Sequence, residues 1–393
     1  MVDRTRRRWI AAATGALLIG AAAVGCAPPS DAETTGSDSP RAVASASVDA
    51  DFDLDQLIAA AKKEGSLTVY DSSGDVVEAA KAFQATYGIR TTGVKSKVAD
   101  TLEKMTRENQ SDNVTIDAVL YEDGPSLVGQ LQPQGIVYTW LPADLSEDVV
   151  SSRRNPLDVL DKAEVFTYNT KLYPDGCPID SVWDLTRPKW AGKLAMQDPL
   201  AKPVFIEFFN ELEAGANQEL ADSYHQEFGT EIPGGQENAA KTWIKRIAAA
   251  DPILTTSDGD AEDAVAAANQ TEPRIGLISN AKFRDVKAKG YPMEVCTGLD
   301  PWPGLSYPKF AAIASKSPHQ QAAQLFVRFM LTEKGIETEN YDGGTSPNKK
   351  VSSGPNPPGL KSFDELFEFD HSRLADDFAE TQQMQDFWRA NHG

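Results

Sequence analysis

This chain is predicted to have an α/β fold in which helices flank a largely parallel sheet, and two observations support the prediction. Short apolar runs typical of buried strands alternate along the chain with segments whose apolar residues recur at helical spacing. Connections long enough to hold a helix are typical of crossover units, which join parallel strands. Of the 393 residues, 41% are hydrophobic and 24% are charged, a composition typical of globular domains.

The elements of the first half follow from residue spacing. Leu54, Leu57, Ile58 and Ala61 lie on one helical face, and Gly65 is expected to end that helix. The next predicted elements are a buried strand over 67–70, a turn over 71–74, a helix from about residue 75, a helical stretch over 100–108 and a strand over 116–121.

The second half repeats the pattern in new sequence. We predict strands over 165–168, 194–196 and 275–278, and helices over 203–213, 236–249 and 261–269. Ser317 as cap and Pro318 at the first position are expected to begin a later helix. A C-terminal helix is expected to begin at the capping box Ser362–Glu365. Its predicted core stripe is Leu374, Phe378, Met384 and Phe387.

The N-terminus has the parts of an export signal. Four arginines, at positions 4, 6, 7 and 8, precede an uncharged run over 10–24 that is too short to span a bilayer comfortably. The tetrapeptide 23–26 (Ala-Val-Gly-Cys) resembles the lipobox of bacterial lipoproteins. This implies cleavage of a signal peptide after residue 25, a lipid such as palmitate on Cys26, and an extracytoplasmic protein anchored to the cell membrane. Residues 5–10 also resemble a twin-arginine signal, with the general secretory route as the alternative.

Residues 26–51 are predicted to form a disordered stalk. Between 27 and 50 they are mostly small, polar or proline residues, with two valines, and cannot bury enough apolar surface to offset the entropy of ordering. The chain beyond the stalk is long enough for two domains.

The charge balance excludes one class of partner. The formal net charge is −20, and −23 without residues 1–25, which carry four arginines and one aspartate. No basic stripe is present to release counterions, so we expect no binding to nucleic acid or to an anionic membrane surface. We interpret the excess acid as a feature that favours solubility.

Two cysteines, Cys177 and Cys296, follow Cys26. In an oxidising compartment two thiols are more often paired than free, which favours a disulfide between them, the alternative being two separate buried thiols. The chain has four dispersed histidines and no Cys-x-x-Cys motif, so we expect no zinc site and no cofactor.

Two phrases of the sequence resemble bacterial extracellular solute-binding proteins of the ferric-ion and phosphonate-type cluster. Residues 61–74 (AKKEGSLTVYDSSG) are similar to the opening of those proteins. Residues 166–172 (FTYNTKL) and 182–199 (VWDLTRPKWAGKLAMQDP) are similar to a later and more specific phrase. The order and spacing of these phrases agree over residues 54–350.

The resemblance implies a two-lobe type II periplasmic-binding-protein fold, with hinge strands between the lobes. Lobe 1 would comprise 52–165 plus 285–350, lobe 2 would comprise 168–280, and a helical tail would cover 355–393. The disulfide would then lie near the hinge. The implied protein is a monomeric, non-enzymatic solute-binding component of an ABC importer. Because the chain lacks the phosphate-loop motif of an ATPase, its expected partners are a membrane permease and a separate ATPase subunit.

We expect a small polar solute to lie beyond the carboxyl ends of the strands, where helix N-termini present unpaired N–H groups. Several candidates have an alternative interpretation: the serines at 72 and 73 cap a helix, the tyrosine at 121 belongs to the core, the aspartate at 198 forms a turn, and those at 258 and 260 stabilise a helix dipole. The candidate ligand residues are Ser72, Ser73, Gly74, Ser96, Tyr121, Glu122, Asp123, Asp198, Asp258, Asp260, Tyr341 and Asp342.

The sequence leaves alternatives open for the identity of the solute and for the class of the protein. Iron-binding members of the resembled group use two adjacent tyrosines where this chain has Tyr341 and Asp342. One phenolate with carboxylates keeps ferric ion as an alternative, although clustered acids favour an organic solute with an amine or hydroxyls. An exported enzyme is the rival class, but the sequence has no GxSxG, HExxH or phosphate-loop motif, and Pro347 makes the SxxK spacing of Ser346–Lys349 a coincidence. A structural or sensor lipoprotein is a further alternative.

Overall fold

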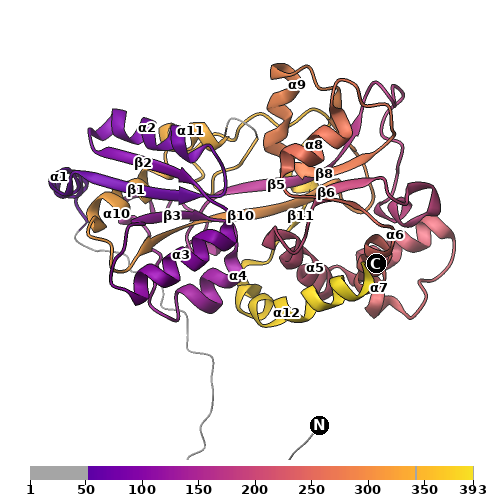
Figure 1. Ribbon diagram of the computed structural model, residues 1–393, viewed down its shortest axis with the longest axis horizontal. Coiled ribbons are helices and arrows are strands. Elements are labelled where there is room, and N and C mark those ends of the chain that lie inside the picture. The colour runs from indigo at the N-terminus through magenta and orange to yellow at the C-terminus, as the bar shows by residue number, and fades with distance from the viewer. Residues whose placement is uncertain (1–51, 341–342, 393) are drawn as a thin grey trace, which may run out of the picture. The chain divides into compact units, whose positions relative to one another are not determined.

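The computed structural model describes residues 52–340 and 343–392, with only the backbone described at Asn340 (Figure 1). The predicted signal peptide, Cys26, the stalk, Tyr341 and Asp342 lie outside these ranges. Across the described ranges, no helix is both long and apolar enough to cross a membrane.

The described residues form one mixed sheet of 11 strands, whose main path runs β2-β1-β3-β10-β5-β8-β6-β7. The short strands β4, β9 and β11 pair with β10, β5 and β10 respectively. The strands are β1 (Ser66–Asp71), β2 (Arg90–Lys95), β3 (Ala118–Tyr121), β4 (Val137–Tyr138), β5 (Asp158–Asn169), β6 (Leu194–Gln197), β7 (Ile253–Thr255), β8 (Ile275–Ser279), β9 (Met293–Val295), β10 (Gly304–Ala314) and β11 (Phe367–Glu368).

Two long antiparallel strands connect two parallel halves of the sheet. β2, β1 and β3 are parallel in the first half, and β8, β6 and β7 are parallel in the second half. β10 runs antiparallel to β3 and to β5, and β5 runs antiparallel to β8. The prediction of a largely parallel sheet is therefore right for each half and wrong for the centre, where β5 and β10 pair in opposite directions.

Helices cover both faces of this sheet. In Figure 1, α2, α11, α8 and α9 lie on one side of the strands, and α3, α4, α5 and α12 lie on the other. The helices are α1 (Leu54–Glu64), α2 (Val76–Tyr87), α3 (Val98–Gln110), α4 (Gly124–Ser126), α5 (Pro203–Gly215), α6 (Asn217–Phe228), α7 (Ala239–Ala249), α8 (Asp258–Ala266), α9 (Arg284–Ala288), α10 (Gln320–Met330), α11 (Glu333–Asn340) and α12 (Leu374–Asn391).

The ends of α1 show how local residues determine a helix. The Asp53 carboxylate accepts hydrogen bonds from the N–H groups of Asp55 and Gln56, which have no partner inside the helix. Gly65, with φ of 78°, ends the helix in the left-handed region that glycine adopts without strain. The predicted stop at Gly65 is therefore confirmed.

The predicted start of the helix near residue 317 is wrong. α10 begins at Gln320, because the Ser317 hydroxyl donates a hydrogen bond to Asp117 and accepts one from the His319 N–H instead of capping a helix at Pro318. The connection to Asp117 ties this turn to the residue that precedes β3.

Each half of the sheet packs against its own hydrophobic clusters. The first half packs with α1, α2 and α10, where Phe83 and Phe326 are fully buried. The second half packs with α5 and α7, where Trp183 and Phe205 are fully buried. The separation of these hydrophobic clusters agrees with a two-lobe fold. The residue ranges given above for the lobes stay a prediction. β9 pairs with Thr167–Asn169 of β5, so this segment runs beside the second half.

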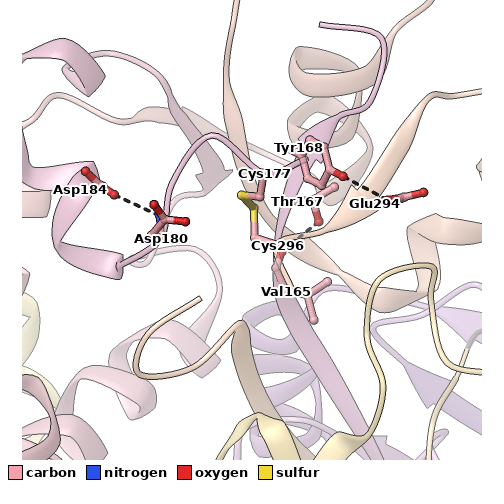
Figure 2. The surroundings of a disulfide bond; sticks show 8 residues. All are labelled: Val165, Thr167, Tyr168, Cys177, Asp180, Asp184, Glu294 and Cys296. Atoms are coloured by element: carbon pink, nitrogen blue, oxygen red, sulfur yellow. Dashed lines mark hydrogen bonds between the residues drawn. A yellow bond between two sulfur atoms is a disulfide. The ribbon is translucent and has the colours of Figure 1, made fainter. Parts of the chain in front are cut away.

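The predicted disulfide between Cys177 and Cys296 is confirmed, with a Cα–Cα distance of 5.1 Å. Figure 2 shows the bond beside the end of β5, where Tyr168 donates a hydrogen bond to Glu294. The Cys296 N–H donates to the carbonyl of Phe166. The bond therefore ties the loop after β5 to the end of β9.

The C-terminal segment differs from the prediction in two ways. Ser362 caps only a short 3-10 turn, Phe363–Glu365, and α12 begins later at Leu374. Phe378 is 37% exposed and is not a core residue, whereas Trp388, which the predicted stripe omitted, is buried.

Candidate solute-binding site

Buried and partly buried charged side chains converge where the strands of the first half end and continue along β5 and β10 to the second half. Ion pairs connect them into two sets, and the charge of Lys202 in one set also acts on Glu122 in the other; we call the two sets together the charge network. Its members are Asp71, Glu122, Lys162, Glu164, Lys202, Asp258, Lys309 and Glu339.

Lys309 of β10 is the centre of the first part of the network. Its side chain is fully buried, and Nζ lies 2.7 Å from Oδ2 of Asp71, the last residue of β1. The same atom lies 2.8 Å from Oε2 of Glu339 in α11 and 3.5 Å from Oε1 of Glu122, which follows β3. Lys162 Nζ of β5 lies 3.4 Å from that Glu122 oxygen. These contacts tie both long strands to the first half.

Lys202 forms the second part of the network. It lies just before α5, where its ammonium contacts Glu164 of β5 and lies 3.2 Å from Oδ2 of Asp258 at the start of α8. The Tyr307 hydroxyl of β10 donates to Oε1 of Glu164 at 3.2 Å. Side chains of β5 and β10 therefore carry the network into the second half.

Burial and neighbouring charges change how these groups ionise. Burial would raise the pKa of Glu122, but the ammonium groups beside it lower the pKa to about 2. Burial raises the pKa of Asp71 to about 7, and burial with the nearby Asp258 charge raises that of Glu164 to about 8. Burial opposes the charge of Lys309, yet adjoining carboxylates hold its pKa well above the ordinary value.

Three buried carboxylate oxygens of the network have no hydrogen-bond partner among the described residues. They are Oε1 of Glu122, Oε2 of Glu164 and Oε1 of Glu339. A buried acceptor without a donor costs about 1–3 kcal/mol, and native proteins keep such groups few. The oxygens of Glu122 and Glu339 can therefore accept hydrogen bonds from hydroxyl or ammonium groups that come from outside the chain, and Glu164, which keeps its proton below about pH 8, can donate one.

The serine turn after β1 lies against the network. The Ser72 hydroxyl donates to Oε2 of Glu122 at 2.8 Å. The Ser73 hydroxyl donates to Oδ2 of Asp75 and accepts from the Asp75 N–H, which supports the start of α2, and Gly74 is exposed. Of these candidates, the structure brings Ser72 and Glu122 together.

Three other candidates of the first half have structural roles. The Ser96 N–H donates to the carbonyl of Asp71. Tyr121 is buried in a hydrophobic cluster, and its hydroxyl lies 3.0 Å from Ser126 Oγ, which agrees with the core interpretation. Asp123 caps α4 by accepting from the Ser126 N–H.

The candidates of the second half divide in the same way. Asp258 belongs to the charge network. Asp260 is exposed and accepts from the hydroxyl of Ser257, whose Oγ caps α8. Asp198 accepts from the Leu200 N–H, as in the turn that was the alternative interpretation. α8 begins at Asp258 rather than at residue 261, because Ser257 supplies its cap.

Sequence reasoning missed Lys162, Lys202, Glu164, Lys309 and Glu339. One signal was available for Lys309, since it is the lone charged residue within the apolar run 303–314. A lysine inside a buried strand needs a buried carboxylate partner. No local pattern shows which carboxylates meet it, because they come from other elements.

A contact between the halves lies outside the network. Arg284 Nη1, where α9 begins, lies 3.2 Å from Oδ1 of Asp75, just before α2. These residues belong to opposite halves of the sheet, so the contact forms only when the halves are close together.

The described residues contain one group with the spacing of a metal site, namely Asp158, Asp161 and His371. Arg153 Nη1 lies 3.2 Å from Oδ2 of Asp158 and 2.8 Å from Oδ1 of Asp161. Because the guanidinium already compensates these carboxylates, we interpret the group as an ion-pair cluster.

One constellation has the spacing of a nucleophilic triad. Ser66 Oγ lies 3.1 Å from Nε2 of His319, and Nδ1 of His319 lies 3.0 Å from Oδ1 of Asp117. The N–H groups at the start of α10, however, donate to the Glu64 carboxylate, whose charge would oppose an oxyanion. Asp117 also accepts from the Thr68 N–H. Glu64 therefore caps α10, and we interpret Ser66, Asp117 and His319 as polar contacts that hold the turn before this helix rather than as an active site.

No protein-family model and no curated protein sequence matches this chain. Solved structures match along most of it. Iron-bound HitA from Pseudomonas aeruginosa is 21% identical, with a TM-score of 0.63 over 83% of this chain and 99% of that chain. Apo ferric ion-binding protein A from Pasteurella haemolytica is 12% identical, with a TM-score of 0.64 over 83% and 98%. The periplasmic binding protein AfuA from Actinobacillus pleuropneumoniae, with fructose-6-phosphate bound, is 19% identical, with a TM-score of 0.59 over 83% and 98%.

The chain therefore has the two-lobe α/β fold of type II periplasmic binding proteins, as the resemblance implied. β5 and β10 are the strands that connect the lobes, and the charge network lies along them.

The carboxyl of Glu164 is expected to make stability fall as the pH rises. Its pKa is about 8 in the folded protein against 4.5 ordinarily, so between these values the folded state holds a proton that the unfolded state releases. The free energy of unfolding then decreases by at most about 1.4 kcal/mol per pH unit because of this group.

Urea denaturation at pH 5.5 and at pH 8 measures this change. Between these two pH values the free energy of unfolding should decrease less for Glu164→Gln than for the unchanged protein. Glu78→Gln, which changes an exposed carboxyl on α2, is the control and should show the same pH dependence as the unchanged protein. If Glu164→Gln also shows the same pH dependence as the unchanged protein, the raised pKa assigned to Glu164 is wrong.

Proposed function

We propose that this protein is the lipid-anchored, extracytoplasmic solute-binding component of an ABC import system and that it binds one small polar solute between its two lobes. The observation that carries the proposal is the set of buried carboxylate oxygens without hydrogen-bond partners at Glu122, Glu164 and Glu339. Glu164 lies on β5, and Glu122 and Glu339 contact Lys309 of β10, so all three lie on or beside the strands that connect the lobes. Solutes of open α/β sheets bind beyond the carboxyl ends of strands. The similarity to periplasmic binding proteins supports the same role.

The chemistry of the network favours an organic solute with hydroxyl or ammonium groups. Such groups can donate hydrogen bonds to the unpartnered oxygens of Glu122 and Glu339, and a hydroxyl can also accept one from the protonated carboxyl of Glu164. Lys162, Lys202 and Lys309 add positive charge to the same network and oppose the entry of a bare trivalent ion. We therefore favour an organic solute over ferric ion, although HitA was solved with iron.

The proposed mechanism is a change of hinge angle. The two lobes would turn about β5 and β10, and the solute would favour the closed form because it contacts both lobes only there. The contact between Asp75 and Arg284 would add to the closed form. A permease would recognise that form, a separate ATPase would drive transport, and the lipid on Cys26 would hold the protein at the membrane.

A thermal-shift screen of small polar solutes, followed by calorimetry on variants, tests the proposed site. Asp258→Asn is expected to weaken binding by about 2–5 kcal/mol if the solute is cationic, because a charge is left unpaired in a dry site. Ser72→Ala is expected to cost about 1 kcal/mol through one lost hydrogen bond. Tyr341→Phe and Asp342→Asn extend the test to the predicted residues outside the described ranges.

Asp260→Asn is the matched control, since Asp260 lies on the same helix as Asp258 but is exposed. Unchanged affinity in Asp258→Asn and Ser72→Ala, or an equal loss in Asp260→Asn, would place the site elsewhere. Recovery of the solute unchanged after incubation separates a binding protein from an exported enzyme.

A further inference from the structure

The C-terminal helix α12 packs against elements of both halves of the molecule. It contacts α4 and the π-helical turn Leu127–Leu131, which follow β3 in the first half, and it also contacts α5 and α7 in the second half. Figure 1 shows α12 extending from α4 towards α7 on the side of the sheet that carries α3 and α5. α2 and α9, next to the contact of Asp75 with Arg284, lie on the other side.

The start of α12 fits closely against the first half. Leu374 is buried in the same hydrophobic cluster as Phe310 of β10. A Cβ atom added at Gly124 would lie 2.6 Å from Cδ2 of Leu374, and one added at Gly129 would lie 2.1 Å from Cγ of Phe378. Side chains do not approach a Cβ this closely, so both glycines are needed for α12 to lie where it does.

The end of α12 is held by the second half. Met384 and Trp388 are buried in the large cluster of that half, and Trp388 stacks on Phe209 of α5 at 5.3 Å between ring centroids. Asn210 Nδ2 of α5 donates to the carbonyl of Asp377 at 3.2 Å. Because this side chain is buried, the bond orients α12 on α5.

We propose that α12 is a brace between the two lobes and that its contact with the first half limits how far the lobes open when no solute is bound. The two ends of the helix are buried in hydrophobic clusters of different halves, so a change in the angle between the lobes must alter one of the two contacts. The contact at the start of α12 is the smaller one, since Phe378 is partly exposed and Leu374 is the one residue of the helix within that cluster. Because α2 and α9 lie on the other side of the sheet, moving them apart turns the lobes towards each other on the side of α12. The close approach of Leu374 to Gly124 and of Phe378 to Gly129 leaves the start of α12 no room for this movement. The inference needs two lobes that move but does not depend on which solute they bind.

Distances between spin labels in the solute-free protein test this brace. The labels are placed at Lys81→Cys on α2 and Lys287→Cys on α9, both exposed, in a Cys26→Ala background with the disulfide kept oxidised. Phe378→Ser removes the ring over Gly129 at a partly exposed site, and Leu374→Ala removes the buried contact. Both variants are expected to shift the distance distribution to longer values, with the larger shift for Leu374→Ala.

Phe387→Ser is the matched control, because Phe387 lies on α12 but packs against the cluster of the second half. It is expected to leave the distribution unchanged. Distributions in Phe378→Ser that equal those of the unchanged protein would overturn the proposal, as would an equal shift in Phe387→Ser. If Leu374→Ala does not fold, Phe378→Ser alone decides. Since no solute is added, this outcome is independent of whether the proposed binding function is correct.

Discussion

Replacing Lys309 with Met is expected to lower the free energy of unfolding by about 3–5 kcal/mol, because it leaves two buried carboxylates without their cation. The side chains of Lys309, Asp71 and Glu339 are all fully buried, and both carboxylates lie within 2.8 Å of the ammonium. Urea denaturation followed by circular dichroism measures the change.

Two further variants separate this cause from a general effect of losing a lysine. Lys81→Met removes an exposed ion pair with Glu78 and is expected to change stability by less than about 1 kcal/mol. Adding Asp71→Asn and Glu339→Gln to Lys309→Met should restore part of the loss, since the remaining groups are then neutral. A loss in Lys309→Met no larger than in Lys81→Met would contradict the described geometry.

Removing the disulfide is expected to have an effect of similar size. Cys177 and Cys296 are separated by 119 positions, and a loop of this length is stabilised by about 4–5 kcal/mol in the chain-entropy model. Cys177→Ser with Cys296→Ala, the latter chosen because Cys296 is buried, should lower the free energy of unfolding by up to that amount.

A reducing agent provides the control for this prediction. It should destabilise the unchanged protein towards the stability of the double variant and should have no effect on the double variant itself. A double variant as stable as the oxidised protein would show that the bond contributes nothing to stability.

The sequence predicted elements whose signal is local. The strand at 67–70 and the helix that carries Phe83 were both recognisable, because apolar spacing and glycine stops occur within a few residues. β2 was missed because it is a half-exposed strand of mostly polar residues. β10 was missed because Pro308 and Lys309 interrupt an otherwise apolar run, although this strand is central to the fold.

The candidate site could be predicted only in part. Glu122 and Asp258 follow from the rule that solutes bind at the carboxyl ends of strands, and both belong to the charge network. Their lysine partners could not be predicted, since the contacts depend on the register of β5 and β10 against the rest of the sheet. Lysine is usually exposed, so its burial at Lys309 follows from tertiary structure alone.

Native mass spectrometry of the protein purified from its own host tests the central claim most directly. We expect one small polar molecule bound per chain, released unchanged on denaturation and absent or depleted in Asp258→Asn. Iron in place of an organic molecule would contradict the favoured solute but keep the binding role. A protein that carries no small molecule and is stabilised by no solute of a broad polar library would contradict the claim that it is a solute-binding protein.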